Sequence, residues 1–157
     1  MSDQTAVHNT FVLERSYPKP PEDVFAAFAD PDKKRRWYAD SRGLEVVAFD
    51  QDFRVGGVER LQYRFNQGSP FPGAALVNEG RYQDIVPNRR IVMASTMAIG
   101  EKCFSASLAT IELIPTDDGT EVILTHQGAF FEGSDGPEMR EAGWRKLFER
   151  LTGELAH

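Results

Sequence analysis

The sequence contains little of what covalent or metal cross-links require. Of its 157 residues, one is cysteine and three are histidine. Cys103 therefore has no partner for an intrachain disulfide, and the histidines show no spacing of the kind that zinc sites use. No glycine-rich phosphate-binding motif and no nucleophile-elbow motif occurs. These absences argue against a disulfide scaffold, and we expect neither a bound metal nor a cofactor.

The chain also lacks an excess of positive charge. It has 18 basic and 24 acidic residues, a formal net charge of −6 and a pI near 5.1. This balance argues against a nucleic-acid partner. No apolar run approaches the roughly 20 residues that span a bilayer, so we expect no membrane insertion. The first residues lack the basic and apolar regions of a signal peptide, and we expect a cytoplasmic protein.

What the sequence does contain is enough apolar material for one domain. Hydrophobic residues make up 41% of the chain and aromatic residues 11%. A domain of this length buries roughly 68–70% of the surface of its unfolded chain. There is no repeat and no long linker. We therefore predict a single domain over residues 1–157, with residues 1–9 as a frayed tail.

The order of local patterns predicts an α+β fold. A first strand at residues 10–17 precedes two short helices at 21–30 and 32–38, and a long amphipathic helix spans 138–155. Further strands are predicted at 44–49, 53–65, 76–86, 90–97, 104–114 and 120–127. Gly56-Gly57 indicates a bulge or bend within the second of these, residues 66–73 a loop, and residues 87–89 and 115–119 turns.

Short connections make this sheet antiparallel, and its apolar face needs a cover. The last helix supplies one, because Trp144, Leu147, Phe148 and Leu151 share a face. Where a curved sheet and a helix diverge, they leave a gap, which is a natural ligand site. The last helix and the sheet therefore predict a cavity between them.

Large side chains from several elements should face this interior and offer a wall for a small hydrophobic or aromatic molecule. The candidate lining residues are Trp37, Tyr63, Phe65, Tyr82, Met93, Met97, Phe104, His126, Phe130, Trp144 and Phe148. The alternative is that they fill the core. His126 shares the inward parity of Val122 and Leu124, and it could orient a ligand or act as a general base near neutral pH.

The run Lys33-Lys34-Arg35-Arg36 is the one basic patch. It could meet an anionic ligand, a membrane surface or a partner protein. A solvated helix face is the commoner explanation, because four charges are few in an acidic chain.

Several motifs resemble those of a known family. They are P-E-D-V-F-A-A-F-A-D-P at residues 21–31 with Trp37, F-R-V-G-G at 53–57, G-R-Y-Q-D-I-V-P at 80–87, and Gly143-Trp144 in the last helix. Together they resemble the AHSA1-like branch of the START-like (SRPBCC, Bet v 1-type) superfamily, over nearly the whole chain. The resemblance implies a helix-grip fold, in which a curved antiparallel sheet of six to seven strands surrounds a long C-terminal helix and a hydrophobic cavity.

The resemblance implies several possible functions, since the superfamily includes lipid carriers, hormone receptors, aromatase/cyclase-like enzymes and co-chaperone domains. The eponymous member activates the Hsp90 ATPase through an additional N-terminal domain. Only about ten residues precede the first strand here, so we do not expect an Hsp90-type chaperone as a partner. We favour ligand binding without catalysis. A cyclase- or hydrolase-type enzyme and a protein-interaction module are the alternatives, and an exposed strand edge could pair two copies as a homodimer.

Overall fold

The computed structural model describes residues 5–40, 44–65, 68 and 73–156. Within them, seven strands form one antiparallel sheet in the order β1-β7-β6-β5-β4-β3-β2. The strands are β1 (Val7–Tyr17), β2 (Glu45–Gln51), β3 (Val58–Arg64), β4 (Ala75–Val86), β5 (Arg90–Ile99), β6 (Lys102–Thr116) and β7 (Gly119–Phe130). The helices are α1 (Pro21–Ala29), α2 (Pro31–Lys34), the π-helix η1 (Arg35–Ala39) and α3 (Pro137–Leu155).

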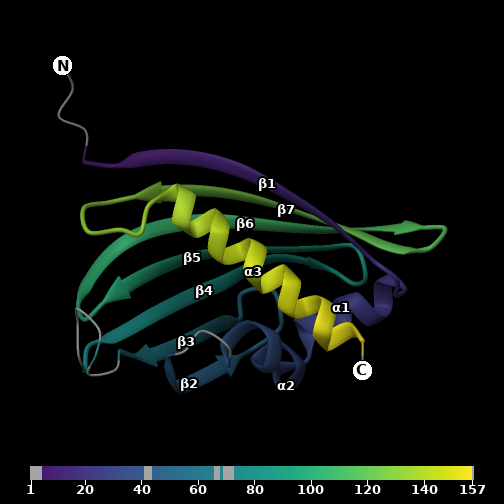
Figure 1. Cartoon of the computed structure of the whole chain (residues 1–157), viewed down its shortest axis with the longest axis horizontal. Helices are drawn as coiled ribbons and strands as arrows, with labels where there is room; N and C mark the ends of the chain where they lie inside the picture. Colours follow the sequence, from purple (N-terminus) through teal and green to yellow (C-terminus); the bar gives the residue numbers. More distant parts are fainter. Residues whose placement is uncertain (1–4, 41–43, 66–67, 69–72, 157) are drawn as a thin grey trace.

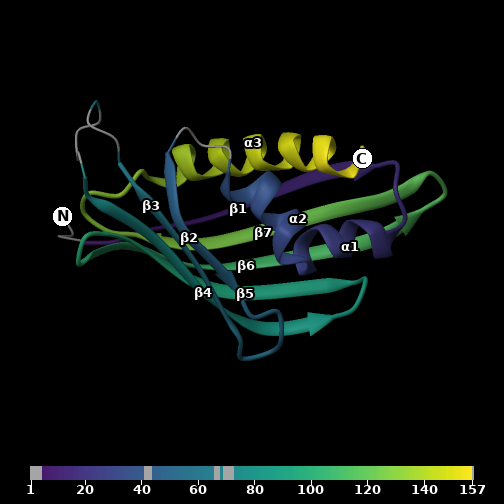
Figure 2. The ribbon, with the colours of Figure 1, turned by 90° about the horizontal axis from the view of Figure 1, so that it is seen from below.

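The sheet is curved, and α3 lies across its concave face (Figures 1 and 2). The C-terminal half of α3 buries Leu147, Phe148 and Leu151, which closes the apolar core. The hydroxyl of Tyr17, at the end of β1, donates a 2.9 Å hydrogen bond to the carbonyl oxygen of Phe148. The predicted α+β helix-grip fold is therefore confirmed.

The first strand is longer than predicted. β1 starts at Val7, so part of the segment that we expected to be frayed belongs to the sheet. Val7 pairs with Phe130 and Asn9 with Gly128 in the ladder with β7. The pairing with β7 orders these residues, which have no apolar alternation of their own to mark a strand.

The predicted strand at 53–65 is wrong in its first part, since residues 53–57 form a turn and β3 begins at Val58. Gly56 has a positive φ of 85°, and its N–H donates to the carbonyl oxygen of Tyr82 at 2.8 Å. A side chain on Gly57 would collide with the carbonyl oxygen of Asp52. The glycine pair therefore makes a turn that packs on β4 instead of a bulge. The loop predicted at 66–73 lies mostly outside the described residues.

The helix predicted at 32–38 is divided between α2 and η1. The N–H of Asp40 donates to the carbonyl oxygen of Arg35 at 2.9 Å, the i→i+5 bond of a π-helix. The wide turn lets consecutive residues face the interior, and Trp37 and Tyr38 are both almost fully buried. The indole N–H of Trp37 donates to the carbonyl oxygen of Ala27 at 2.8 Å, which ties η1 to α1.

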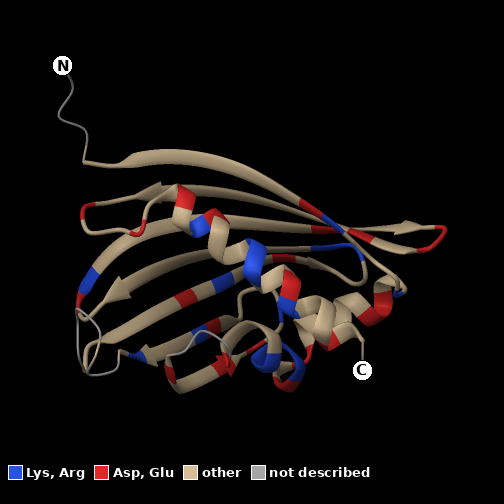
Figure 3. Ribbon diagram, in the orientation of Figure 1, with Lys and Arg blue, Asp and Glu red and all other residues tan. Residues whose placement is uncertain are grey.

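The basic run at residues 33–36 is used largely for internal pairing. Lys34 is 5% exposed and lies 2.6 Å from Glu59, which is 3% exposed. Arg36 makes two hydrogen bonds, of 2.9 and 2.7 Å, with Glu154 of α3. Figure 3 shows the basic segment of α2 and η1 beside acidic residues. The expectation of a solvated helix face is therefore wrong for Lys34.

Glu59 is the centre of a buried polar network. Its carboxylate also accepts hydrogen bonds from the Tyr82 hydroxyl and from the Gln51 amide. Burial, and then the charge of Glu59, raises the pKa of Tyr82, so the phenol stays protonated and keeps donating. The network connects α2 to β2, β3 and β4, and thereby holds η1 over the sheet.

Removing one charge of this pair should destabilise the fold. We expect Lys34→Met to lower the free energy of unfolding by about 3–5 kcal/mol, because Glu59 would be left buried without its cation. Lys33→Met, at the neighbouring position without a buried partner, should change it by no more than about 0.5 kcal/mol. Urea unfolding of both variants measures the difference, and equal effects would show that the buried pair has no special weight.

Candidate functional site

A row of small side chains crosses the middle of the concave face. The strand register places Gly80 opposite Ser95, Ser95 opposite Ser107, and Ser107 opposite Gly128. The hydroxyls of Ser95 and Ser107 lie 3.2 Å apart and share a hydrogen bond. Such small side chains fill little of the space beneath α3. The space at this site exists because these four residues are small.

The rows on either side contain larger side chains, together with the small residues Ala109 and Ser105. One row contains Tyr82, Met93, Ala109, His126 and Phe11; the other contains Asn78, Met97, Ser105 and Phe130. Two of them lean over the glycines. A Cβ on Gly80 would lie 2.6 Å from the sulfur of Met93, and a Cβ on Gly128 would lie 2.9 Å from the ring of Phe130. The glycines are therefore needed for these side chains to hold their positions.

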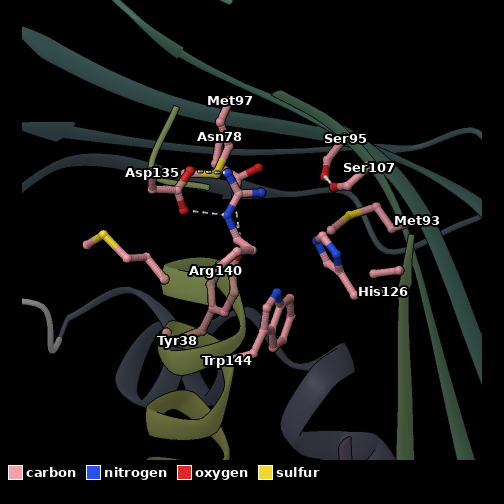
Figure 4. Close-up of a pocket in the computed structure, with 13 residues that line it drawn as sticks. Tyr38, Asn78, Met93, Ser95, Met97, Ser107, His126, Asp135, Arg140 and Trp144 are labelled. Carbon is pink, nitrogen blue, oxygen red and sulfur yellow. Dashed lines mark hydrogen bonds and ion pairs between the residues drawn. The ribbon is translucent and has the colours of Figure 1, made fainter. Parts of the chain in front are cut away.

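A cavity of about 80 Å³ lies between the small-residue row and the N-terminal half of α3 (Figure 4). The sheet lines it with Asn78, Met93, Ser95, Met97, Ser107, Ala109 and His126. α3 and the loop before it contribute Asp135, Met139, Arg140, Gly143 and Trp144, and η1 contributes Tyr38. Met139, which is 67% exposed, marks the rim. The lining combines apolar side chains with hydrogen-bonding groups.

A second void of about 10 Å³ lies deeper, where Trp37, Tyr82, Met93 and Trp144 meet. A volume of this size holds no more than about one water molecule. The aromatic part of the interior is therefore closely packed. The larger cavity lies next to this packed region, and Met93 and Trp144 border both.

Arg140 is the cationic group of the cavity and is 8% exposed. Its Nε and Nη2 each donate to a carboxylate oxygen of Asp135 at 2.9 Å, and Nη2 also donates to the Ser105 hydroxyl at 2.9 Å. The guanidinium lies 5.0 Å from the ring centre of Phe130. The remaining nitrogen, Nη1, makes no hydrogen bond with a described residue, and Figure 4 shows it facing the cavity.

The Arg140–Asp135 pair is electrically balanced. Burial by itself would raise the pKa of Asp135, but the hydrogen bonds and the charge of Arg140 outweigh it, and the pKa of Asp135 is lowered. The carboxylate is therefore ionised at neutral pH. The two charges of the pair cancel, so the pair gives the cavity no net charge.

His126 extends from β7 into the cavity and is 2% exposed. Its ring stacks on Phe11, with 4.7 Å between ring centres, and Nδ1 has no hydrogen-bond partner among the described residues. Burial, and then the charge of Arg140, lowers the pKa of His126 to about 4. The imidazole is therefore neutral at pH 7. It does not titrate near neutral pH, contrary to the expectation for a general base there.

Trp144 and Tyr38 form the side of the cavity opposite the sheet. The indole Nε1 of Trp144 makes no hydrogen bond with a described residue, and in Figure 4 it points into the cavity. The hydroxyl of Tyr38 accepts a 2.9 Å hydrogen bond from the amide of Asn78. This bond joins η1 to β4 and holds the side of the cavity in place.

The residues predicted to line the cavity fall into three groups. Met93, Met97, His126 and Trp144 border the larger cavity. Trp37 and Tyr82 border the small void, as do Met93 and Trp144. Tyr63, Phe65, Phe104, Phe130 and Phe148 border neither.

The third group was mistaken for cavity lining because large aromatic side chains also fill cores. Phe148 is fully buried in the packed half of α3, and the Tyr63 hydroxyl donates to the carbonyl oxygen of Ala39 at 2.9 Å. Phe104 is buried. Phe130 is also buried, and its ring packs against the lining residues His126 and Arg140 without bordering the cavity itself. Phe65 follows the end of β3 and is only partly buried.

The polar half of the site, which includes Ser95 and Arg140, is not among the residues predicted from the sequence. Ser95 has the same strand parity as Met93 and Met97, and Arg140 lies four residues before Trp144 on α3. Both spacings were usable signals. Aromatic and sulfur content does not mark such polar residues, which come together only through the pairing of strands and the placing of α3.

Among the described residues, no group of three or more His, Cys, Asp or Glu side chains is arranged to hold a metal ion. Nor does any helix in the described part of the chain have the length and apolar composition to cross a membrane. The carboxylate of the cavity is already paired with Arg140. The lining of the cavity consists of hydrogen-bonding and apolar side chains.

Comparison with known proteins identifies the family to which the chain belongs. A family model described as "Activator of Hsp90 ATPase homolog 1-like protein" matches residues 18–156. The chain belongs to the AHSA1-like family. The match places it in the AHSA1-like branch of the START-like superfamily and confirms the resemblance of its motifs. A search of curated proteins finds no match.

Solved structures show the same AHSA1-like fold. The chain is 44% identical to the Mll3558 protein from Rhizobium loti, with a TM-score of 0.86, over 96% of this chain and 99% of that one. It is 33% identical to an uncharacterised protein from Rhizobium leguminosarum, with a TM-score of 0.88, over 96% of each chain. An AHSA1-like protein from Aeromonas hydrophila shares the fold at 20% identity and a TM-score of 0.68, over 94% of this chain and 92% of that one.

The lowered pKa of His126 should make stability depend on pH. Between pH 6.5 and about 4 the unfolded chain binds a proton at His126 that the native protein excludes. Above pH 6.5 His126 is neutral in both states and costs no stability. As the pH drops towards 4, the free energy of unfolding falls by at most about 3 kcal/mol, because only the unfolded chain takes up this proton.

Urea unfolding at several pH values, with His126→Gln as the comparison, tests this. The carboxylates titrate in both proteins, so the difference between the two curves isolates the imidazole. We expect the unsubstituted protein to lose more stability on acidification than the variant. Parallel curves would contradict the lowered pKa.

Proposed function

We propose that this AHSA1-like protein binds a small molecule with an aromatic or otherwise apolar body and a polar end in the cavity beneath α3. The observation that carries the proposal is the Gly80–Ser95–Ser107–Gly128 row, which keeps space open at the centre of the sheet. Polar groups facing inward reduce stability unless they are partnered. An orphaned His126 Nδ1 and the open donors beside it therefore favour a binding site over a filled core.

The apolar body of a ligand would rest on Trp144 and on the methionines Met93, Met97 and Met139. As it stands, a cavity of about 80 Å³ accepts a group of few heavy atoms. Methionine side chains have several soft torsions and adapt to different shapes, so their movement would widen the space. Apolar burial contributes about 25 cal/mol per Å² of surface removed from water.

An enzyme that uses His126 as its base is less well supported. Its pKa of about 4 makes the imidazole a weak base, and no described carboxylate is bonded to Nδ1 to orient it. The absence of an Hsp90-type partner, the cytoplasmic location and the possible homodimer stay predictions from the sequence.

Filling the cavity from α3 should block binding. Gly143 lines the cavity and a Cβ there meets nothing within 4 Å, so we expect Gly143→Leu to fold and to fill the space. Gly153→Leu is the matched control, because Gly153 lies on the same helix, is exposed and also has nothing within 4 Å of an added Cβ. Both changes remove a helical glycine, which favours the helix by up to about 1 kcal/mol.

The probes are toluene, indole, benzamide and benzoate, followed through the methyl signals of Met93, Met97 and Met139 in NMR titrations. We expect at least one probe to shift these signals in the unsubstituted protein and in Gly153→Leu. Its affinity should fall at least about tenfold in Gly143→Leu. Binding of no probe, or equal binding to both variants, would refute the proposed function.

A further inference from the structure

The hydrogen-bonding groups left open in the cavity are mainly donors. Arg140 Nη1 and Trp144 Nε1 make no hydrogen bond with a described residue, and both face the same space (Figure 4). They come from neighbouring turns of α3, four residues apart. Two N–H groups that face the same space can both donate to one acceptor oxygen bound between them.

The charge balance of the cavity determines which kind of oxygen fits. Asp135 uses Nε and Nη2 of Arg140 in two hydrogen bonds of 2.9 Å and cancels its charge. The lining has no other Lys, Arg, Asp or Glu among the described residues, and His126 is neutral at pH 7. A ligand carboxylate would therefore lose its hydration without gaining an unpaired cation, which is unfavourable.

We infer that the cavity recognises an uncharged acceptor, the carbonyl oxygen of an amide, ketone or ester, through Arg140 Nη1 and Trp144 Nε1, and discriminates against carboxylates. The inference rests on the proposed function and narrows the ligand to aromatic carbonyl compounds. Asp135 acts in it as a positioning residue, because it orients the guanidinium and supplies the negative charge that repels an acid. A hydrogen bond from a charged donor to a neutral carbonyl needs no further counterion.

Benzamide, benzoate and toluene test the inference, because they share one ring and differ in the group attached to it. In the unsubstituted protein we expect benzamide to bind more tightly than toluene and at least about tenfold more tightly than benzoate, a difference of about 1.4 kcal/mol. The methyl signals of Met93, Met97 and Met139 give the affinities.

Removing the charge of Asp135 should reduce the discrimination against carboxylates. We expect Asp135→Asn to change the ratio of benzoate to benzamide affinity at least about tenfold in favour of benzoate, because Arg140 would then carry surplus charge. Asp118→Asn is the matched control, since Asp118 is exposed in the turn between β6 and β7 and its loss changes the net charge equally. The ratio should not change in that variant.

A second variant keeps the test independent of how Asp135→Asn folds. Trp144→Phe keeps an aromatic wall, although it replaces the indole by a smaller ring, and it removes the indole N–H. We expect it to weaken benzamide binding while leaving toluene binding within about twofold of its original value.

Two results with the unsubstituted protein would overturn the inference while leaving the proposed function in place. One is benzoate binding as tightly as benzamide or more tightly, and the other is toluene binding as tightly as benzamide. An unchanged affinity ratio in Asp135→Asn would also contradict it. If none of the three compounds binds while indole does, and Gly143→Leu blocks indole, the carbonyl anchor is wrong although the cavity binds ligands.

Discussion

The pairing of strands β4 to β7 is the constraint on which the site depends. It brings Gly80, Ser95, Ser107 and Gly128 into one line, although they are scattered over 49 positions of the chain. Replacing any of them by a large side chain would fill the hollow or push aside the neighbours that lean over it. The register of the hairpins therefore decides both where the space lies and which side chains surround it.

Much of the fold could be predicted from the sequence, because its signals are local. Alternating residues and turn residues identify strands, and the spacing of Trp144, Leu147 and Phe148 identifies a covering helix. The errors arose where tertiary contacts decide. Residues 53–57 looked like a strand until the docking of Gly56 on Tyr82 showed a turn, and residues 7–9 are held in the sheet only by β7.

The site was harder to predict, because its residues meet only across strands and helices. Met93, Met97, His126 and Trp144 were found by their chemistry and inward parity. Arg140 belongs to no motif in the sequence, and the structure places it against Asp135, Ser105 and Phe130. The Arg140–Asp135 pair is local, but its burial depends on α3 meeting Ser105 and Phe130 of the sheet, and single-sequence periodicity does not show which strands α3 will meet.

The two halves of α3 are attached to the rest of the protein unequally. Its C-terminal half is fixed by Phe148, by the bond from Tyr17 and by the pairing of Glu154 with Arg36. Its first turns are fixed mainly by the contacts of Arg140 with Ser105 of β6 and with the ring of Phe130 of β7. Apolar packing fixes the C-terminal half of α3, so local opening of the helix is expected to begin at its first turns. Such opening would let a small molecule enter the cavity while the core stays folded.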